Sequence, residues 1–171
     1  MSKSYNYKDF RIEILYEDSD IAILNKPSGL LTHKKNEFDN SPSLQESLKD
    51  QFTIDDDEKF KEGIVHRLDK DTSGVIIITK NLISKNKFKE MFKNRKIKKN
   101  YLAFTYGVLN QNNLEINRNI SRNKFQRTKF NVSDNLGKNA ITKVSNVRIF
   151  HGSISLLDCE ITVSYTHLTL P

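Results

Sequence analysis

The sequence predicts an α+β fold in which a mixed, mostly antiparallel sheet is flanked by helices. Three observations lead to this prediction. Most apolar runs are short and lie between turn-forming residues, as strands do. Only two segments repeat apolar residues at helical spacing. Two strand-like runs flank His151-Gly152, a pair of residues that indicates a hairpin.

Strands are expected where these apolar runs occur, at residues 12–16, 21–24, 75–79, 101–108, 141–150 and 153–162. The sequence Ser43-Leu-Gln-Glu46 has the form of a capping box, which predicts a helix over residues 43–52. A second helix is expected over 84–94, where apolar residues and lysines occupy opposite faces. The asparagine-rich segment 110–123 is expected to be irregular, and the acidic segment after residue 52 to be a loop.

The charge of the chain is concentrated in one segment. The 171 residues carry a formal net charge of +7. Residues 84–100 contain eight lysines and arginines and one acid, an excess equal to that of the whole chain. Such a segment fits a polyanionic partner such as a nucleic acid. A lysine-rich helix face is also a common form of plain solvated surface, so this alternative stays open on charge alone.

The composition also argues against several classes of protein. No run of about 18 apolar residues is present, so no membrane-spanning helix and no membrane partner are expected. The single cysteine, Cys159, cannot form an internal disulfide or a cysteine-rich zinc site. It fits a reducing, cytoplasmic setting. We expect a monomer that needs no metal and no cofactor.

One segment concentrates reactive groups. Residues 63–74 read Gly-Ile-Val-His-Arg-Leu-Asp-Lys-Asp-Thr-Ser-Gly and lead directly into an apolar run. Asp69 lies beside Arg67 and His66 in the sequence and is followed by a tight polar turn. A carboxylate presented from a short, constrained segment is a candidate nucleophile or base, so Asp69 is the main candidate for chemistry.

This segment resembles the H-R-L-D-x-x-T-S-G catalytic motif of the RluA-type pseudouridine synthases. Two further pieces occur in the same order as in that family. Residues 16–29 are similar to its first motif, and Lys99-Asn-Tyr101-Leu-Ala103 with Gly107 is similar to its K-x-Y-x-A element. The resemblance spans residues 10–162 and implies a pseudouridine synthase catalytic domain there, without the S4 RNA-binding domain that some members have.

The resemblance implies that the chain isomerises specific uridines in structured ribosomal or transfer RNA. In that reaction the N1–C1′ bond breaks, the uracil turns, and C5 bonds to the same sugar carbon, with no cofactor or metal. The family's catalytic aspartate corresponds to Asp69, which would attack C1′ or take a sugar proton. The sequence does not distinguish the RNA or the uridine.

Other residues are assigned to substrate binding by the same resemblance. The target base must leave its stack, and the family arginine at the position of Arg67 helps to expel it. Tyr101 matches the tyrosine that packs on the base. His66 is expected to contact substrate, although a histidine that only orders the loop is an open alternative. For Lys26, a phosphate contact and a role in its loop are both open.

The second predicted helix is expected to bind the RNA backbone without reading the sequence of bases. The lysines assigned to this role are Lys85, Lys89, Lys93 and Lys96.

The family pattern is lost after Ile161. It continues as T-G-R-x-H-Q-I-R, whereas here Tyr165 takes the place of the arginine that pairs with the aspartate. We interpret residues 163–171 as a foreign tail, a sequence artefact that resembles a translated sequencing adaptor. Residues 10–162 would then be the N-terminal part of a truncated domain, and the chain as it stands is expected to have little activity.

Three alternatives remain. The main one is a catalytically inactive, RNA-binding fragment of such an enzyme, which the missing arginine and the basic helix favour. A glycosidase would need two paired acids, and nothing pairs convincingly with Asp69. A zinc deaminase would need histidine and cysteine ligands that Cys159 alone cannot supply.

Overall fold

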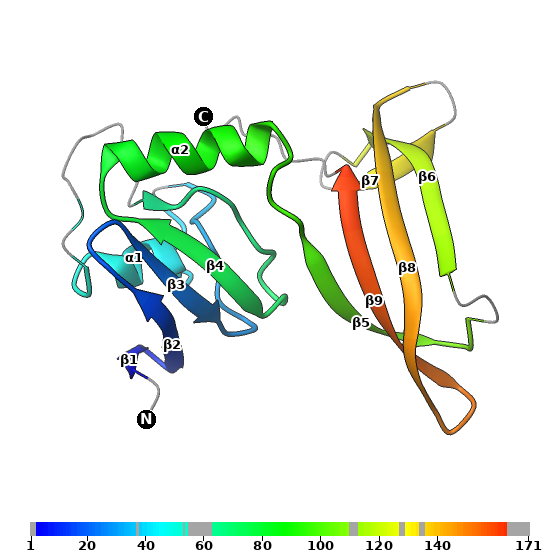
Figure 1. The fold of residues 1–171 in the computed structure, drawn as a ribbon, viewed down its shortest axis with the longest axis horizontal. Coiled ribbons are helices and arrows are strands. Elements are labelled where there is room, and N and C mark those ends of the chain that lie inside the picture. The colour runs from blue at the N-terminus through cyan, green and yellow to red at the C-terminus, as the bar shows by residue number, and fades with distance from the viewer. Residues whose placement is uncertain are drawn as a thin grey trace. The chain divides into compact units, whose positions relative to one another are not determined.

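The chain folds into two compact units, residues 1–94 and 95–171 (Figure 1). The computed structural model describes residues 3–36, 38–52, 54, 63–109, 113–126, 129–133 and 136–163. These residues form nine strands and two helices, and every strand pair within the two sheets is antiparallel. The predicted α+β class is confirmed.

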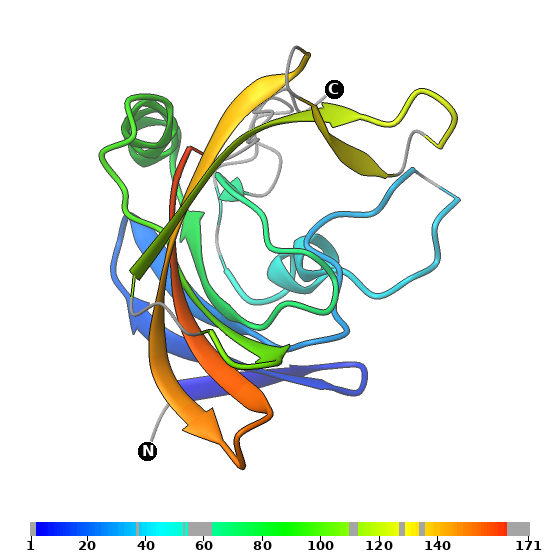
Figure 2. The ribbon, with the colours of Figure 1, turned by 90° about the vertical axis from the view of Figure 1, so that its right-hand side faces the viewer.

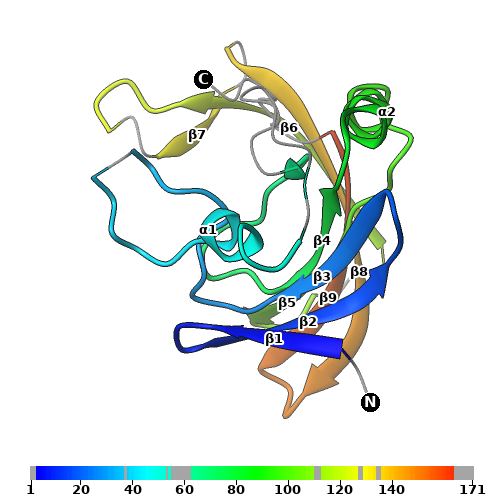
Figure 3. The ribbon, with the colours of Figure 1, turned by 90° about the vertical axis from the view of Figure 1, so that its left-hand side faces the viewer.

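The first unit is a four-stranded sheet in the order β1-β2-β3-β4 with two helices (Figure 3). Its strands are β1 (Lys3–Tyr7), β2 (Phe10–Glu17), β3 (Ile21–Lys26) and β4 (Gly74–Thr79). The helices are α1 (Leu44–Leu48), which lies over one face of the sheet, and α2 (Leu82–Lys93), which follows β4. Strand β1 was not predicted from the sequence.

The core of the first unit lies between this sheet and α1. In β3 and β4, alternate residues point to one face and are fully buried, as expected for an antiparallel sheet with a single covered face. The core residues are Ile12, Ala22, Leu24, Leu30, Leu44, Leu48, Phe52, Ile64, Ile76 and Ile78.

Side-chain caps fix where the two helices begin. Ser43 Oγ accepts a hydrogen bond from Glu46 N at 3.3 Å, as the capping box predicts, but α1 ends at Leu48 and is shorter than the expected 43–52. Asn81 Oδ1 accepts a hydrogen bond from Ser84 N at 2.9 Å. Helix α2 therefore begins at Leu82, two residues before the predicted start, because an asparagine is a strong N-cap.

The second unit is a five-stranded sheet in the order β5-β9-β8-β6-β7 (Figure 2). The strands are β5 (Asn100–Tyr106), β6 (Asn113–Arg122), β7 (Phe130–Ser133), β8 (Lys138–Phe150) and β9 (Ile154–Val163). The predicted hairpin is confirmed: β8 and β9 are joined through His151 and Gly152, whose positive φ angles of 48° and 65° suit a tight hairpin turn.

The prediction that residues 110–123 are irregular is wrong for the part that the structure describes. Residues 113–122 form β6, which pairs with β8 and with β7, a strand that was also not predicted. Asparagine has a low strand propensity, but pairing with neighbouring strands overrides it here. One cross-strand contact joins two asparagines directly, from Asn139 Nδ2 to Asn117 Oδ1 at 2.6 Å.

Two expectations fall on residues outside the described part of the chain. The acidic loop lies mostly at 53 and 55–62, and the proposed tail lies at 164–171 apart from its first residue. Both stay predictions. Neither helix of the described residues is long and apolar enough to cross a membrane.

Candidate active site

Asp69 lies on a surface loop of the first unit that leads into β4. Upstream of it, Ile64 forms an isolated bridge with Ile78, so this segment starts at the edge of the sheet. Val65 and Leu68 are buried, with 1% and 7% of their surface exposed. The Asp69 side chain that follows is 88% exposed. Leu68 is therefore buried, whereas the Asp69 carboxylate, one residue later, is exposed to solvent.

Thr32 fixes the backbone directly before Asp69. Its Oγ1 donates a hydrogen bond to Leu68 O at 2.7 Å and accepts one from Leu68 N at 3.2 Å. Thr32 is 2% exposed, so water does not compete for these bonds. Sequence reasoning missed this residue, because nothing in the local pattern around Thr32 signals a partner 36 residues away.

Lys26 fixes the backbone directly after Asp69. Its Nζ donates hydrogen bonds to three carbonyl oxygens, those of Leu30 at 2.7 Å, Pro27 at 3.0 Å and Lys70 at 3.1 Å. The side chain is fully buried, and this burial lowers the pKa of the Lys26 ammonium. The negative charges of Asp71 and Asp69 oppose that shift. The sequence left two roles open for Lys26, a phosphate contact and a role in its loop. These contacts are those of a role in the loop.

Further hydrogen bonds join the two loops. Gly29 N donates to Lys70 O at 2.9 Å, and Ser28 Oγ donates to Asp71 O at 2.8 Å. Within the second loop, Thr72 N donates to Asp69 O at 3.2 Å. The loop at 26–32 therefore supports the backbone of the loop that carries Asp69. This gives a structural reason for the motif at 16–29 and the motif at 63–74 to occur in one chain.

Arg67 lies two residues before Asp69 in the sequence, and the structure brings the two side chains near one another. Arg67 Nη2 lies 4.0 Å from Asp69 Oδ1, and the side chains are 69% and 88% exposed. An exposed pair of this kind contributes little to stability, about 0–1 kcal/mol. The role of Arg67 in binding substrate stays a prediction.

His66 connects the loop that carries Asp69 to β4 and α2. Its Nε2 accepts a hydrogen bond from Ile77 N at 2.9 Å, which ties the loop to β4. Its ring lies against Phe92 of α2, with 4.9 Å between ring centroids. These are the contacts of a histidine that orders the loop. The expected substrate contact of His66 stays a prediction.

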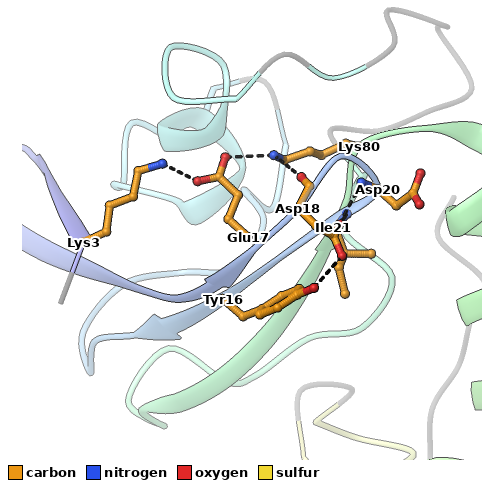
Figure 4. A network of polar contacts seen from close by, with 7 residues as sticks. All are labelled: Lys3, Tyr16, Glu17, Asp18, Asp20, Ile21 and Lys80. Atoms are coloured by element: carbon orange, nitrogen blue, oxygen red, sulfur yellow. Dashed lines mark hydrogen bonds and ion pairs between the residues drawn. The ribbon is translucent and has the colours of Figure 1, made fainter.

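Lys80, the residue that follows β4, fixes the end of that strand (Figure 4). Its Nζ donates to Glu17 Oε1 at 2.8 Å and to Asp18 O at 2.7 Å. Glu17 is also paired with Lys3. Hydrogen bonds from Lys3 and then Lys80 lower the pKa of the Glu17 carboxyl. Asp18 in turn accepts hydrogen bonds from two backbone N–H groups of its own turn.

The predicted RNA-binding lysines differ in exposure; three of them lie in α2, and Lys96 follows the end of that helix. Lys93 and Lys96 are exposed and Lys89 is half-buried. Lys85 departs from the expectation, because it lies with Ser84 on the buried face of α2 and is only 1% exposed. An ammonium in that position is not on the helix surface, so Lys85 is removed from the set.

Tyr101 lies in the second unit, on β5, where it is half-buried and paired with Cys159 of β9. The relation of Tyr101 to substrate stays a prediction. In the described part of both units, no three His, Cys, Asp or Glu side chains are grouped in a way that could hold a metal ion.

Comparison with known proteins gives a consistent result. Residues 20–167 match the family model described as RNA pseudouridylate synthase. Ribosomal large subunit pseudouridine synthase D of Borreliella burgdorferi is 38% identical over 162 residues, which cover 91% of this chain and 48% of that protein. Ribosomal large subunit pseudouridine synthase C of Rickettsia bellii is 35% identical over 146 residues, 85% of this chain and 46% of that protein.

A solved structure, Human RNA Pseudouridylate Synthase Domain Containing 1, has the same fold. It superimposes with a TM-score of 0.71 at 21% identity and covers 91% of this chain and 61% of that one. The chain spans about half the length of the curated relatives it matches.

Proposed function

The chain belongs to the RNA pseudouridylate synthase family, and from this we propose that it isomerises specific uridines in structured RNA with Asp69 as the catalytic residue. The observation that carries the proposal is the setting of Asp69. Its side chain is 88% exposed, while buried groups of Thr32 and Lys26 hold the backbone on either side of it. That arrangement leaves the Asp69 carboxylate accessible to a ligand while the backbone that carries it is held in place.

The chemistry needs a positioned carboxylate and little else. The N1–C1′ bond breaks, the uracil turns, a C5–C1′ bond forms, the proton on C5 leaves and N1 takes up a proton. Atoms and electrons balance without an oxidant, a metal or a cofactor. Asp69 would act either on C1′ as nucleophile or on a sugar proton as base. Both routes gain from a fixed backbone, because small misplacements of the reacting group are costly.

The remaining site residues act on the base and its surroundings. Arg67, 4.0 Å from Asp69, would take part in expelling the uracil from its stack, a step that costs a few kcal/mol. Tyr101 would receive the flipped base, at about 1–3 kcal/mol for a stacked base. His66 would contact substrate from the loop that it orders.

The substrate is proposed to be ribosomal or transfer RNA. Two of the relatives are named for the large ribosomal subunit, which favours ribosomal RNA. Lys89, Lys93 and Lys96 would contact its phosphates. We propose a cytoplasmic monomer, since ribosomal and transfer RNA are located there.

The test follows the hydrogen on uracil C5, which is replaced when the new bond forms. RNA carrying tritium at that position releases it on isomerisation. Asp69→Asn should abolish release while RNA affinity stays within a few-fold, because the change removes charge and almost no volume. Asp71→Asn is the matched control, since Asp71 is exposed, lies two residues on, and accepts the hydrogen bond of Ser28 through its backbone oxygen.

Three outcomes are decisive. Release by Asp69→Asn at the unchanged rate ends the assignment of Asp69. Equal losses in Asp69→Asn and Asp71→Asn point to a general effect of charge on the loop. RNA binding by the unchanged chain without any release favours the alternative of an inactive RNA-binding protein.

A further inference from the structure

The second unit carries a basic segment that the proposed site does not use. Residues 116–133 contain five lysines and arginines and no acid. They form most of β6, the turn after it and β7, called here the β6–β7 hairpin. Four of the five cations lie in the described residues, Arg118, Arg122, Lys124 and Lys129.

Strand register assigns one face of this sheet to Tyr101. Tyr101 pairs with Cys159, Cys159 pairs with Val144, and Val144 pairs with Leu114. Directly paired residues of antiparallel strands point to the same side. These four side chains therefore form one row across the sheet, on what we call the Tyr101 face.

The hairpin continues the same face. Side chains alternate along a strand, so Arg118 and Arg122 share the side of Leu114. Phe130 of β7 pairs with Arg122 and lies on that side too. The Arg122 guanidinium lies over the Phe130 ring, 5.6 Å from its centroid. The Tyr101 face thus runs into a surface of cations and an aromatic ring.

The two faces differ in charge. In the described residues of the second unit all three acids, Glu115, Asp158 and Glu160, lie in the alternate register, on the face opposite to Tyr101. There they line a hollow of about 430 Å³. The Tyr101 face has no acid within the described strands. A polyanion would therefore meet attraction on one face and carboxylates on the other.

The tip of the hairpin holds an exposed ring in a fixed turn. Phe125 is 96% exposed. Asn123 Oδ1 accepts hydrogen bonds from Phe125 N at 2.8 Å and from Gln126 N at 2.9 Å. Asn123 N donates to Lys129 O at 2.9 Å. The turn is therefore built by its own hydrogen bonds, and it displays an aromatic ring between Lys124 and Lys129 rather than burying it.

We propose that the β6–β7 hairpin end of the Tyr101 face, where Arg118, Arg122 and Phe125 are exposed, binds an unpaired stretch of the RNA substrate that flanks the target uridine. Arg118 and Arg122 contact its phosphates, and an unpaired base stacks on Phe125. Arginine planes and aromatic rings are the groups on which splayed RNA bases stack. The proposal rests on the proposed function, and it adds that the substrate has unpaired nucleotides away from the uridine.

The geometry sets a length for that stretch. The eight residue steps from Leu114, in the row of Tyr101, to Arg122 cover about 27 Å along the strand. That is about the length of eight stacked bases.

The opposite face offers a matched control. Arg148 lies over the Phe150 ring, 4.9 Å from its centroid, much as Arg122 lies over Phe130. Arg148 pairs with Leu156, and Leu156 pairs with Phe104, which alternates with Tyr101 along β5. The same chemical pair is thus present on both faces, and only one face should bind RNA.

The experiment uses the full chain with two probes, an RNA stem-loop with an unpaired uridine-containing loop and a fully paired RNA duplex of equal length. Binding is followed by fluorescence anisotropy over a range of salt concentrations. Replacing Arg118 and Arg122 together by glutamine should lower the salt slope for the stem-loop by about 1.4–1.8, at 0.7–0.9 for each contact. Arg148→Gln should leave that slope unchanged.

Phe125 tests the stacking. Phe125→Ala should weaken stem-loop binding about 5- to 150-fold without changing the salt slope, leave duplex binding unchanged, and be rescued by Phe125→Trp. Because this side chain is 96% exposed, the substitutions do not disturb a core.

The proposal would be overturned if Arg148→Gln changed the salt slope as much as the double replacement of Arg118 and Arg122. It would also be overturned if poly-glutamate of equal charge displaced the stem-loop. The tritium assay keeps the two proposals apart. Tritium release combined with unchanged slopes rejects this surface and leaves the function standing. No release combined with the expected slopes rejects the function and keeps the surface.

Discussion

The Thr32 hydroxyl holds Leu68 by both of its backbone polar groups, donating to the carbonyl at 2.7 Å and accepting from the N–H at 3.2 Å. One buried side chain therefore replaces two partners that a β-ladder would supply. The residue that follows Leu68 is Asp69, so the proposed catalytic group sits at the end of a peptide that cannot shift without breaking both bonds.

Thr32→Val should destabilise the first unit and reduce isomerisation. The change keeps the shape of the side chain but leaves a buried N–H and a buried carbonyl without their partner, a loss of about 1–3 kcal/mol in the free energy of unfolding. Thr32→Ser keeps the hydroxyl and should lose less. Urea denaturation measures the difference. If valine and serine variants are equally stable, the two bonds do not carry the loop.

Lys26→Met should be strongly destabilising, by about 3 kcal/mol, because three carbonyl oxygens lose a charged donor inside the protein. Lys70→Met is the control, since Lys70 is exposed and contributes its backbone oxygen to the same contacts. Thermal melting of both variants decides the matter. If the two variants melt at the same temperature, the hydrogen bonds of Lys26 do not contribute to stability.

Glu17→Gln should remove part of the loss of stability in acid. The pKa of Glu17 is lowered from 4.5, so the unfolded chain binds more protons than the folded one between the lowered pKa and that value. The contribution of the ionised carboxylate is fully present above about pH 5.5 and disappears as the pH falls through the folded pKa.

The measurement is the free energy of unfolding against pH. At pH 7 the Gln variant should be less stable by up to about 1 kcal/mol, and the difference should close as the pH falls through the folded pKa and shrink in high salt. A constant difference across this range would show that the pairs with Lys3 and Lys80 do not act through charge.

Arg67→Gln should lower the rate of isomerisation and change the free energy of unfolding by less than about 0.5 kcal/mol, because the side chain is mostly exposed. Arg67→Lys should recover only part of the rate, since an ammonium lacks the planar fork of a guanidinium. Single-turnover kinetics and melting are measured on the same samples. Full activity of the Gln variant would remove Arg67 from the site.

The lysines in and directly after α2 allow RNA binding to be measured separately from folding. Replacing Lys89, Lys93 and Lys96 by glutamine should lower the salt slope of RNA binding by about 2.1–2.7. Lys85→Met, in the same helix but 1% exposed, should change melting and leave the slope alone. The reverse pattern would show that the buried lysine, and not the exposed set, faces RNA.

What the sequence could predict depended on how local the determining interactions are. The hairpin at His151-Gly152 and the cap at Ser43 are set by a few neighbouring residues, and both were predicted. Strand β6 was missed because its asparagines disfavour strands locally, while pairing with β8 decides its conformation.

The loop that carries Asp69 shows the same division. Its motif is continuous in the sequence, so Asp69 and Arg67 were found together. Thr32 could not be found, because its partner is 36 residues away and its hydroxyl looks like any other. The burial of Lys85 depends on which helical turn meets the sheet, and lysine spacing alone does not reveal that.

The contact of Lys26 with Lys70 O joins positions 44 residues apart and has a consequence for protein engineering. The segment 63–74 is not a portable module. Grafted onto another scaffold by itself, it would bring the Asp69 carboxylate but leave behind the Lys26 ammonium and the Thr32 hydroxyl that hold its backbone. A transplant should carry residues 26–32 as well, and directed evolution of either stretch should find compensating changes in the other.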